Sequence, residues 1–462
     1  MPSLPTAPRG RAMLLLAVLL AGAALPVRPA TAGATEPCRT VEGGAGARAL
    51  RLATFDTAWH RVHVTHFDTT FNGVDWRRVR AELRPRAVAA RCTEELRAVI
   101  ADMLARLGQS HFAIIPRERA GGLERARRAD DERPGSLGLE LRILEDSLVV
   151  WRVAPDGAAA AAGVRPGWIL LAADTSELAP YVRRVPAEIP SRQRALHGIA
   201  AVSSVLQGGV GETARLRLLD GSGAVVEVEV RRRPVAGTAV TFGNLPTFYT
   251  VLERAEADGG RVGVVRFNAW MPTIMPGLDS AIERHRGGDG IVLDLRGNPG
   301  GVAGLMMGVS GHFLEARASL GTMKNRAGEL RFNANPRLVS PSGTRVRPFA
   351  GPVAILVDEL TGSTSEAFAA GMQAIGRAHI VGRPTAGAVL PAVMERLPNG
   401  DVLYHAVADF IAPDGTRLEG RGVRPDEDVP LTRAALLAGR DPQMESALAW
   451  IRRTGSGGGR AP

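Results

Sequence analysis

The feature that most constrains this chain is an alternation of strand-like and helix-like segments that begins near Gly260. Four short apolar runs are typical of buried strands, at residues 261–267, 290–295, 352–357 and 378–382. Helix-like stretches, such as residues 276–287 (PGLDSAIERHRG), lie between them. Strands that alternate with helices in this way predict an α/β core.

Two other kinds of sequence precede the core. Residues 49–107 are mostly helical, because apolar side chains recur at helical spacing in stretches such as TEELRAVIADMLARLG. From Ser136 to about residue 233, short strand-like runs surround one small helix. Within them, residues 213–232 form a predicted hairpin that turns at residues 220–223. This second part is therefore a compact, mostly β module.

The first 32 residues are typical of a signal peptide. Arg9 and Arg11 precede an apolar run that is too short to span a bilayer comfortably, and residues 30–32 (ATA) supply small side chains for cleavage after Ala32. A retained membrane anchor is the alternative. We therefore expect an exported protein, periplasmic or extracellular, with no stable membrane span after cleavage.

The charged residues and the cysteines bear on the partners and the compartment of the protein. The formal net charge of +10 comes almost entirely from dispersed arginines, since Lys324 is the single lysine of the 462 residues. The sequence has no basic stripe interleaved with aromatic residues, so we expect no nucleic-acid partner. In an oxidising compartment Cys38 and Cys92 can form a disulfide, and two free thiols are the alternative.

The first of two strand-turn-helix junctions is residues 293–301 (LDLRGNPGG). Glycines between a strand and a helix let backbone amides point at an anion. A phosphate-binding loop would need a Gly-Lys-Ser/Thr ending, which this stretch lacks. An oxyanion hole and a plain tight turn both stay open.

The second junction is residues 360–372 (LTGSTSEAFAAGM). Ser363 with Glu366 three residues later fits a capping box, in which the serine only satisfies a helix amide. A serine on a sharp strand-to-helix turn can equally be a nucleophile, with the amide of Thr364 as an oxyanion donor. The residues alone leave both interpretations open.

Several motifs, in order, resemble the carboxy-terminal processing (tail-specific) serine peptidases. Residues 362–387 resemble the active-site segment of that family, residues 291–301 its glycine loop, and residues 420–429 (GRGVRPDEDV) its closing Gly-Val-x-Pro-Asp motif. Residues 153–174 are similar to a PDZ domain. Residues 71–85 and 103–116 resemble the helical N-terminal region of the tricorn-like branch.

The resemblance implies an α/β fold with a crotonase/ClpP-like spiral protease core, a mostly β PDZ-like domain and an N-terminal helical region. The expected division of the chain combines this resemblance with the sequence patterns above. We expect a signal peptide at 1–32, the helical region at 33–125, the PDZ-like domain at 126–235, the protease core at 236–440, and a C-terminal helix with a flexible tail at 441–462.

One departure from the family pattern concerns the catalytic base. The best-known members use a Ser-Lys dyad, but the lysine position is Ala388 here, in the stretch TAGAV. Histidine is the usual alternative base. His60, His63 and His66 are spaced by three but lack a paired carboxylate or cysteine pattern, so we interpret them as structural or surface residues and expect no metal or other cofactor.

His111, in the stretch GQSHF, follows a helix stop on a loop from which it can reach another domain. The resemblance to the tricorn-like branch implies that Ser363 is the nucleophile and His111 the base, with Ser110 and Glu419 orienting the catalytic groups. Gly300 or Gly301, together with Thr364, would bind the oxyanion. Glu366 is left as the cap of its own helix.

The PDZ-like region has a candidate peptide-binding loop. PDZ modules add a peptide strand to a sheet edge and hold its carboxylate in a loop of amides. The residues of the candidate loop are Gly135, Ser136, Leu137, Gly138 and Leu139. A rigid spacer is the alternative.

The sequence therefore predicts an exported serine endopeptidase of the tail-specific class that acts on protein or peptide substrates. A ligand-binding protein or a PDZ adaptor with a degenerate protease core is the alternative. The oligomeric state is not predicted.

Overall fold

The computed structural model describes residues 38, 41, 43–118, 133–183, 185, 189, 191–241 and 247–457. The predicted signal peptide, its cleavage site and the predicted tail after residue 457 lie outside these described residues. In the part of the chain that is described, no helix is both long enough and apolar enough to cross a membrane.

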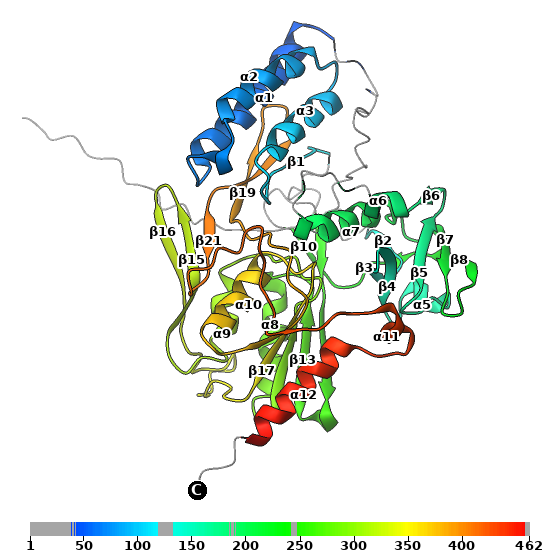
Figure 1. Ribbon diagram of the computed structural model, residues 1–462, viewed down its shortest axis with the longest axis vertical. Helices are drawn as coiled ribbons and strands as arrows, with labels where there is room; N and C mark the ends of the chain where they lie inside the picture. Colours follow the sequence, from blue (N-terminus) through cyan, green and yellow to red (C-terminus); the bar gives the residue numbers. More distant parts are fainter. Residues whose placement is uncertain are drawn as a thin grey trace, which may run out of the picture.

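The N-terminal unit contains three helices, α1 (Ala45–Thr65), α2 (Trp76–Ala89) and α3 (Thr93–Ala105), at the top of the molecule in Figure 1. They pack around one apolar core that includes Phe55, Leu83 and Ile100, none of which is exposed. The helical periodicity of the sequence predicted this packing, because apolar side chains at that spacing share one face of a helix. The short strand β1 (Ala113–Ile115) follows α3 and leaves the unit.

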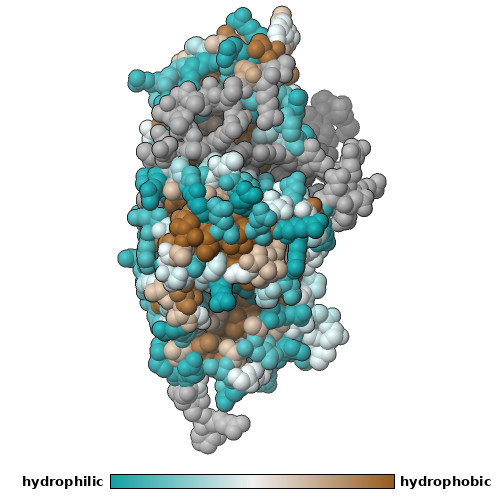
Figure 2. All heavy atoms as spheres, turned by 90° about the vertical axis from the view of Figure 1, so that its right-hand side faces the viewer, coloured by the Kyte–Doolittle hydropathy of each residue, from teal (hydrophilic) through white to brown (hydrophobic). Residues whose placement is uncertain are grey.

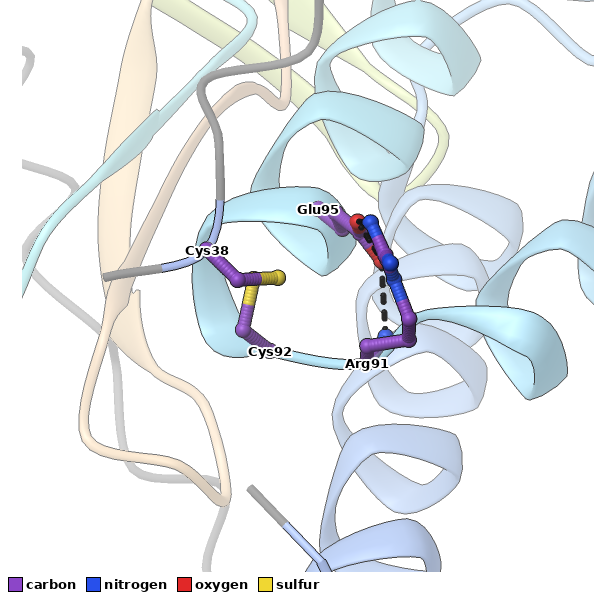
Figure 3. The surroundings of a disulfide bond; sticks show 4 residues. All are labelled: Cys38, Arg91, Cys92 and Glu95. Carbon is purple, nitrogen blue, oxygen red and sulfur yellow. Dashed lines mark hydrogen bonds and ion pairs between the residues drawn. A yellow bond between two sulfur atoms is a disulfide. The ribbon is translucent and has the colours of Figure 1, made fainter. Parts of the chain in front are cut away.

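A disulfide joins Cys38 to Cys92 across 54 residues of sequence, with 5.7 Å between the Cα atoms. Figure 3 shows Cys92 at the start of α3, beside the ion pair of Arg91 with Glu95, and Cys38 on the segment that precedes the helical unit. The pairing that the sequence left open is therefore formed, and it ties the N-terminal arm to α3.

The second unit is rich in β-structure. Its strands are β2 (Gly135–Ser136), β3 (Leu139–Leu144), β4 (Ser147–Val153), β5 (Ile169–Ala173), β6 (Ser176–Glu177), β7 (Thr213–Leu219), β8 (Val225–Arg231) and β9 (Arg233–Pro234). Its helices are α5 (Ala158–Ala161), α6 (Ala179–Arg183) and α7 (Arg194–Val205). The main antiparallel path runs β3-β4-β5-β7-β8, which leaves β3 at one edge. The predicted hairpin is confirmed as β7 paired with β8.

Figure 2 views the molecule from the side on which this β-rich unit lies. Hydrophobic side chains form patches at mid-height on that face, among hydrophilic ones.

The third unit is the α/β core that the sequence predicted. Its main sheet has the order β12 (Leu252–Ala257), β13 (Val262–Phe267), β14 (Gly290–Asp294), β17 (Val353–Val357), β18 (His379–Gly382) and β22 (Glu427–Asp428). From β13 to β22 the neighbours are parallel, and β12 is antiparallel to β13. The four predicted apolar runs are thus four adjacent strands.

Helices cover both faces of this sheet. They are α8 (Met275–Arg284), α9 (Leu305–Ser310), α10 (Thr364–Ala374) and α12 (Pro442–Gly457). The largest apolar cluster of the molecule lies on the side of α8, α9 and α10, and α12 covers a smaller cluster through Ala447 and Ile451. After the glycine loop the chain first stays extended, because the amide of Val302 donates to the carbonyl of Trp270 beside a bridge of Trp270 with Gly301, and α9 begins only at Leu305.

Two small sheets complete the core. One contains β16 (Gly328–Ala334), β15 (Ala318–Asn325) and β21 (Asp409–Ile411), and the other contains β1, β20 (Val402–Ala406) and β19 (Ala392–Arg396). Strands β10 (Thr238–Val240) and β11 (Phe248–Thr250) pair with each other, and α11 (Arg433–Leu437) lies against the β-rich unit (Figure 1). The β1–β20 pairing docks the helical unit on the core, and residues 108–112 lie just before that junction.

Candidate active site

Ser363 lies at the turn between β17 and α10, where it is the N-cap of the helix. Its φ of 50° and ψ of −114° lie outside the regions that residues with a side chain commonly adopt. Strained backbone of this kind persists where the surroundings impose it, and it is often found at functional sites. Ser363 is 6% exposed, so its hydroxyl is presented on a tight turn that is nearly buried.

The glycine loop packs directly on this turn. A Cβ atom at Gly300 would lie 2.8 Å from Cβ of Ser363 and 3.0 Å from the amide nitrogen of Thr364, and φ of Gly300 is +108°. Both the space and the backbone conformation therefore require glycine. The hydroxyl of Thr364 also donates to the carbonyl of Gly301, with 2.9 Å between the oxygens.

The three predicted oxyanion donors differ in how they are used. The amide of Gly300 donates to the side-chain oxygen of Asn298 at 2.9 Å, so it is already engaged. In the described part of the chain, the amides of Gly301 and Thr364 donate to no protein acceptor. Of the two candidate glycines, Gly301 is the one whose amide is available beside Thr364.

Glu366 is a residue whose role sequence reasoning underestimated. Its carboxylate accepts hydrogen bonds from the amide of Ser363 at 2.9 Å, the amides of Gly387 at 2.7 Å and Ala388 at 3.0 Å, and the hydroxyl of Thr385 at 2.5 Å. Burial raises the pKa of this fully buried carboxyl, and the four donors oppose that effect. The capping-box spacing identified only its bond to Ser363.

The segment that carries Ala388 contacts the serine backbone. The carbonyl of Ala388 accepts the amide of Ser363 at 2.9 Å, and the Ala388 side chain is 4% exposed. Lys324, the single lysine, lies on β15, and its ammonium pairs with Glu329 at 3.1 Å. The position that carries lysine in a Ser-Lys dyad is therefore filled here by a methyl group.

Ser110, His111 and Glu419 form one hydrogen-bonded set. The Ser110 hydroxyl lies 2.5 Å from Nδ1 of His111 and 2.9 Å from Oε2 of Glu419, and the Ser110 amide donates to Oε1 of Glu419 at 2.7 Å. His111 is 8% exposed and has a φ of +65°, the left-handed region that favours glycine. Its ring contacts that of Tyr404 on β20, with 5.6 Å between centroids.

Burial acts on the two titratable groups of this set in opposite directions. It lowers the pKa of His111 to about 3, so the imidazole is neutral. It raises the pKa of Glu419 to about 7, against the hydrogen bonds from Ser110 and Val389 that favour the ionised form. When Glu419 is ionised, the Ser110 hydroxyl donates to it and accepts Nδ1–H of His111, which leaves the lone pair on Nε2.

Nε2 of His111 is buried and makes no hydrogen bond to any described residue, Ser363 included. His111 and Ser363 are linked only through other residues. Oε2 of Glu419 accepts the amide of Val389 at 3.0 Å, and the adjacent Ala388 accepts the amide of Ser363. The structure thus joins His111 and Glu419 through Ser110, and none of the three makes a hydrogen bond to the hydroxyl of Ser363 among the described residues.

The β-rich unit reaches under the glycine loop. Nε of Arg142 on β3 donates to Oδ2 of Asp358 at 2.7 Å, and these side chains are only 7% and 5% exposed. Oδ1 of Asp358 accepts the amide of Gly297, the third residue of the loop after β14, at 2.8 Å. Nothing in the local sequence around Arg142 signalled this ion pair, because its partner is 216 residues away.

The β-rich unit also contacts the segment around Ala388. Nε2 of Gln193, which is 2% exposed, donates to the carbonyl of Gly387 at 3.0 Å. Gly387 is the residue whose amide Glu366 accepts. The unit therefore contacts the site through Arg142 on one side and Gln193 on the other.

The predicted peptide-binding loop joins β2 to β3. Gly138 has a φ of +71°, and its amide donates to the Ser136 hydroxyl at 3.0 Å. The carbonyls of Leu137 and Gly138 accept amides of Ala159 and Ala154, both at 2.8 Å. The loop is therefore fixed within its own unit, beside the free edge of β3.

Comparison with known proteins finds two family models that match parts of this chain. Residues 261–429 match the model of peptidase family S41, and residues 48–105 match that of the tricorn protease C1 domain. A carboxyl-terminal-processing protease of Picosynechococcus sp. is 26% identical over 378 residues, which are 81% of this chain and 82% of the relative. The chloroplastic carboxyl-terminal-processing peptidase 2 of Arabidopsis thaliana is 24% identical, over 81% of this chain and 68% of that protein.

Among solved structures, the photosystem II D1 C-terminal processing protease aligns over 88% of this chain and 97% of its own, with a TM-score of 0.56 and 22% identity. That likeness shows a shared fold. The chain therefore contains an S41 peptidase domain preceded by a tricorn C1 domain. The expectation of a serine-type peptidase is confirmed at this level.

Proposed function

We propose that this chain, with its S41 peptidase domain, is an exported endopeptidase of the tail-specific class that uses histidine in place of lysine as its base. The observation that carries the proposal is the hydrogen-bonded set of Ser110, His111 and Glu419, which Val389 joins to the segment beside Ser363. This set supplies a neutral imidazole with an available Nε2, which is what a serine nucleophile needs from its base.

In the proposed reaction, Ser363 Oγ attacks the carbonyl carbon of the scissile peptide and Nε2 of His111 takes its proton. The amides of Gly301 and Thr364 stabilise the negative charge that develops on the carbonyl oxygen. The carbon–nitrogen bond then breaks, and Nε2 passes the proton to the leaving amine. Water hydrolyses the acyl-enzyme on Ser363 by the same proton transfers in reverse order.

Ser110 and Glu419 act through His111 in this scheme. The ionised carboxylate orients the Ser110 hydroxyl, which keeps Nδ1 protonated, and it stabilises the imidazolium that forms during attack. Nε2 of His111 makes no hydrogen bond to Ser363 in this structure. We therefore propose that substrate binding brings Nε2 of His111 and Oγ of Ser363 within hydrogen-bonding distance. The proposed chemistry uses only side chains and amides of the chain itself.

The proposal extends to the rest of the molecule. We assign the spiral fold of the ClpP and crotonase type to the core and a PDZ-like role to the β-rich unit, in which the edge of β3 accepts the tail of a protein or peptide substrate. The contacts of Arg142 and Gln193 with the site support a link between that unit and catalysis. The paired cysteines support export, since disulfides persist in oxidising compartments.

A fluorophosphonate probe tests the proposed chemistry, because it labels only an activated serine. We expect the mature wild-type protein to be labelled, and Ser363→Ala and His111→Ala to lose labelling. No labelling of the wild type above the Ser363→Ala background would contradict the enzyme and favour a ligand-binding protein or adaptor. Labelling that survives His111→Ala would contradict the proposed base alone.

A further inference from the structure

His66 lies just after the end of α1 and is completely buried. Its Nε2 lies 3.0 Å from Oε1 of Gln109, and its Nδ1 lies 2.8 Å from the carbonyl oxygen and 3.1 Å from the amide nitrogen of Asp68. Burial lowers the pKa of His66, so the ring is neutral. The neutral ring carries one proton and faces a carbonyl oxygen on each side; in the tautomer protonated on Nε2, the ring donates to Gln109 and Nδ1 accepts the amide of Asp68.

Two of the residues that contact His66 flank Ser110 and His111 in the sequence. Gln109 immediately precedes Ser110, and Phe112 immediately follows His111. The ring of Phe112 stacks on that of His66, with 5.7 Å between centroids and 16° between planes. One buried ring therefore holds the segment at both ends of the Ser110–His111 pair.

Residues 66–72, which include His66, make a further contact with residues 107–112. The side-chain amide of Asn72 donates to the carbonyl of Leu107 at 2.9 Å. Residues 66–72 thus support residues 107–112 from the helical unit, while Glu419 holds Ser110 from the core. The segment is therefore held by contacts from two different units.

Such support matters because His111 has a left-handed backbone conformation. A non-glycine residue keeps a conformation of this kind only where its surroundings determine it. An imidazole that is misplaced by about 1 Å costs a reaction roughly 100-fold in rate.

We infer that His66 is a positioning residue for the proposed base, acting on His111 through Gln109 and Phe112. This inference rests on the proposed function. It assigns a role in the reaction to the helical unit, which would supply both the base and the side chain that fixes it.

The test measures fluorophosphonate labelling of Ser363 at several probe concentrations, which separates the maximal labelling rate from probe affinity. His66→Phe keeps a stacked ring but removes the hydrogen bond to Gln109, and Gln109→Ala removes the same bond from its other end. We expect each to lower the maximal rate roughly 10- to 100-fold with unchanged probe affinity. The double variant should be no slower than the slower single variant.

Two further variants separate positioning from folding. His66→Gln places an amide nitrogen near the position of Nε2, so it should recover part of the rate lost in His66→Phe. His63→Phe is the matched control, because His63 stacks on Trp59 and Phe71 in the same unit and makes no ring contact with residues 109–112 among the described residues. We expect it to label at the wild-type rate.

Several outcomes would overturn the inference while the proposed function stands. In each, the wild type is labelled and His111→Ala is not. The first is that His66→Phe and Gln109→Ala are labelled at the wild-type rate. The second is that their effects add in the double variant. The third is that the rate loss in Gln109→Ala matches its loss of folded protein. If the wild type itself is not labelled, the proposed function fails first.

Discussion

Glu366 and Glu419 divide three successive backbone amides between them. Gly387 and Ala388 donate to Glu366, and Val389 donates to Glu419. Glu366 also accepts the amide of Ser363, and Glu419 accepts the amide and hydroxyl of Ser110. Two buried carboxylates that bind one short segment, residues 387–389, therefore link the proposed nucleophile to the proposed base.

The first prediction concerns Glu366. In Glu366→Gln, one of the two acceptor oxygens becomes an NH₂ group, which cannot accept the donors that face it. Losing hydrogen bonds from buried donors costs roughly 1–3 kcal/mol each, so we expect a lower melting temperature and slower labelling of Ser363. Glu359→Gln is the matched control, since Glu359 lies on the same turn but its side chain is 39% exposed. Equal effects of the two changes would contradict the assigned role.

The second prediction concerns the pH dependence set by Glu419. Its pKa of about 7 in the folded protein lies above the ordinary value of 4.5. The raised pKa stabilises the fold below pH 4.5, and this stabilisation is lost as the pH rises through 7. A shift of this size corresponds to about 3 kcal/mol.

We therefore expect the melting temperature of Glu419→Gln relative to the wild type to rise between pH 4.5 and 7 and to level off above it. Labelling of Ser363 should show the opposite dependence, since the proposed orienting group is the ionised carboxylate. Its rate in the wild type should increase with pH through about 7, and Glu419→Gln should lose that dependence. An unchanged pH midpoint in the variant would rule out Glu419 as the titrating group.

The third prediction concerns the glycine loop. Gly300→Ala would place a methyl group 2.8 Å from Cβ of Ser363, at a φ of +108°. We expect labelling to fall by at least about 100-fold, because either the turn or the oxyanion donors must move. Gly304→Ala is the control, since its added Cβ atom meets nothing within 4 Å. Mass spectrometry of the labelled peptide measures both, and normal labelling of Gly300→Ala would show that the loop tolerates displacement.

The fourth prediction concerns the buried ion pair of Arg142 and Asp358. Removing one partner leaves a buried charge without its counterion, which typically costs about 3–5 kcal/mol. Arg142→Met and Asp358→Asn should each destabilise the protein and slow labelling, and a double-mutant cycle should show that the two effects are not additive. The control is Arg152→Met on β4, because Arg152 and its partner Glu253 are 35% and 43% exposed, so their pair contributes less than about 1 kcal/mol. Additive effects of Arg142→Met and Asp358→Asn would show that the pair does not couple the two units.

Local sequence patterns predicted much of the fold. The apolar runs became the adjacent strands β13, β14, β17 and β18, because strand-forming runs that alternate with helices pack as one parallel sheet. The hairpin of β7 and β8 and the helices α1 to α3 followed from periodicity in the same way. The turn at Ser363 was also predicted, since a serine between a buried strand and an alanine-rich helix indicates a tight junction.

The sequence predicted only part of the candidate site. Ser110, His111 and Glu419 were named together through a family resemblance, and their contact is made between residues 309 positions apart. The full role of Glu366, the ion pair of Arg142 and the contact of His66 with Gln109 had no local pattern to signal them.

The sequence by itself determined the order of strands and helices, the two glycine- and serine-containing turns, and the replacement of the family lysine by Ala388. Each of these is a property of neighbouring residues, namely hydrophobic periodicity, backbone freedom or side-chain identity. Only the tertiary structure decided which carboxylate meets which amide, that Cys38 pairs with Cys92, and that Nε2 of His111 is buried without a hydrogen bond to Ser363. Those relationships depend on how distant segments pack, within one unit for the disulfide and between units for Ser110 and Glu419, because burial and hydrogen bonds between such segments arise only in the folded chain.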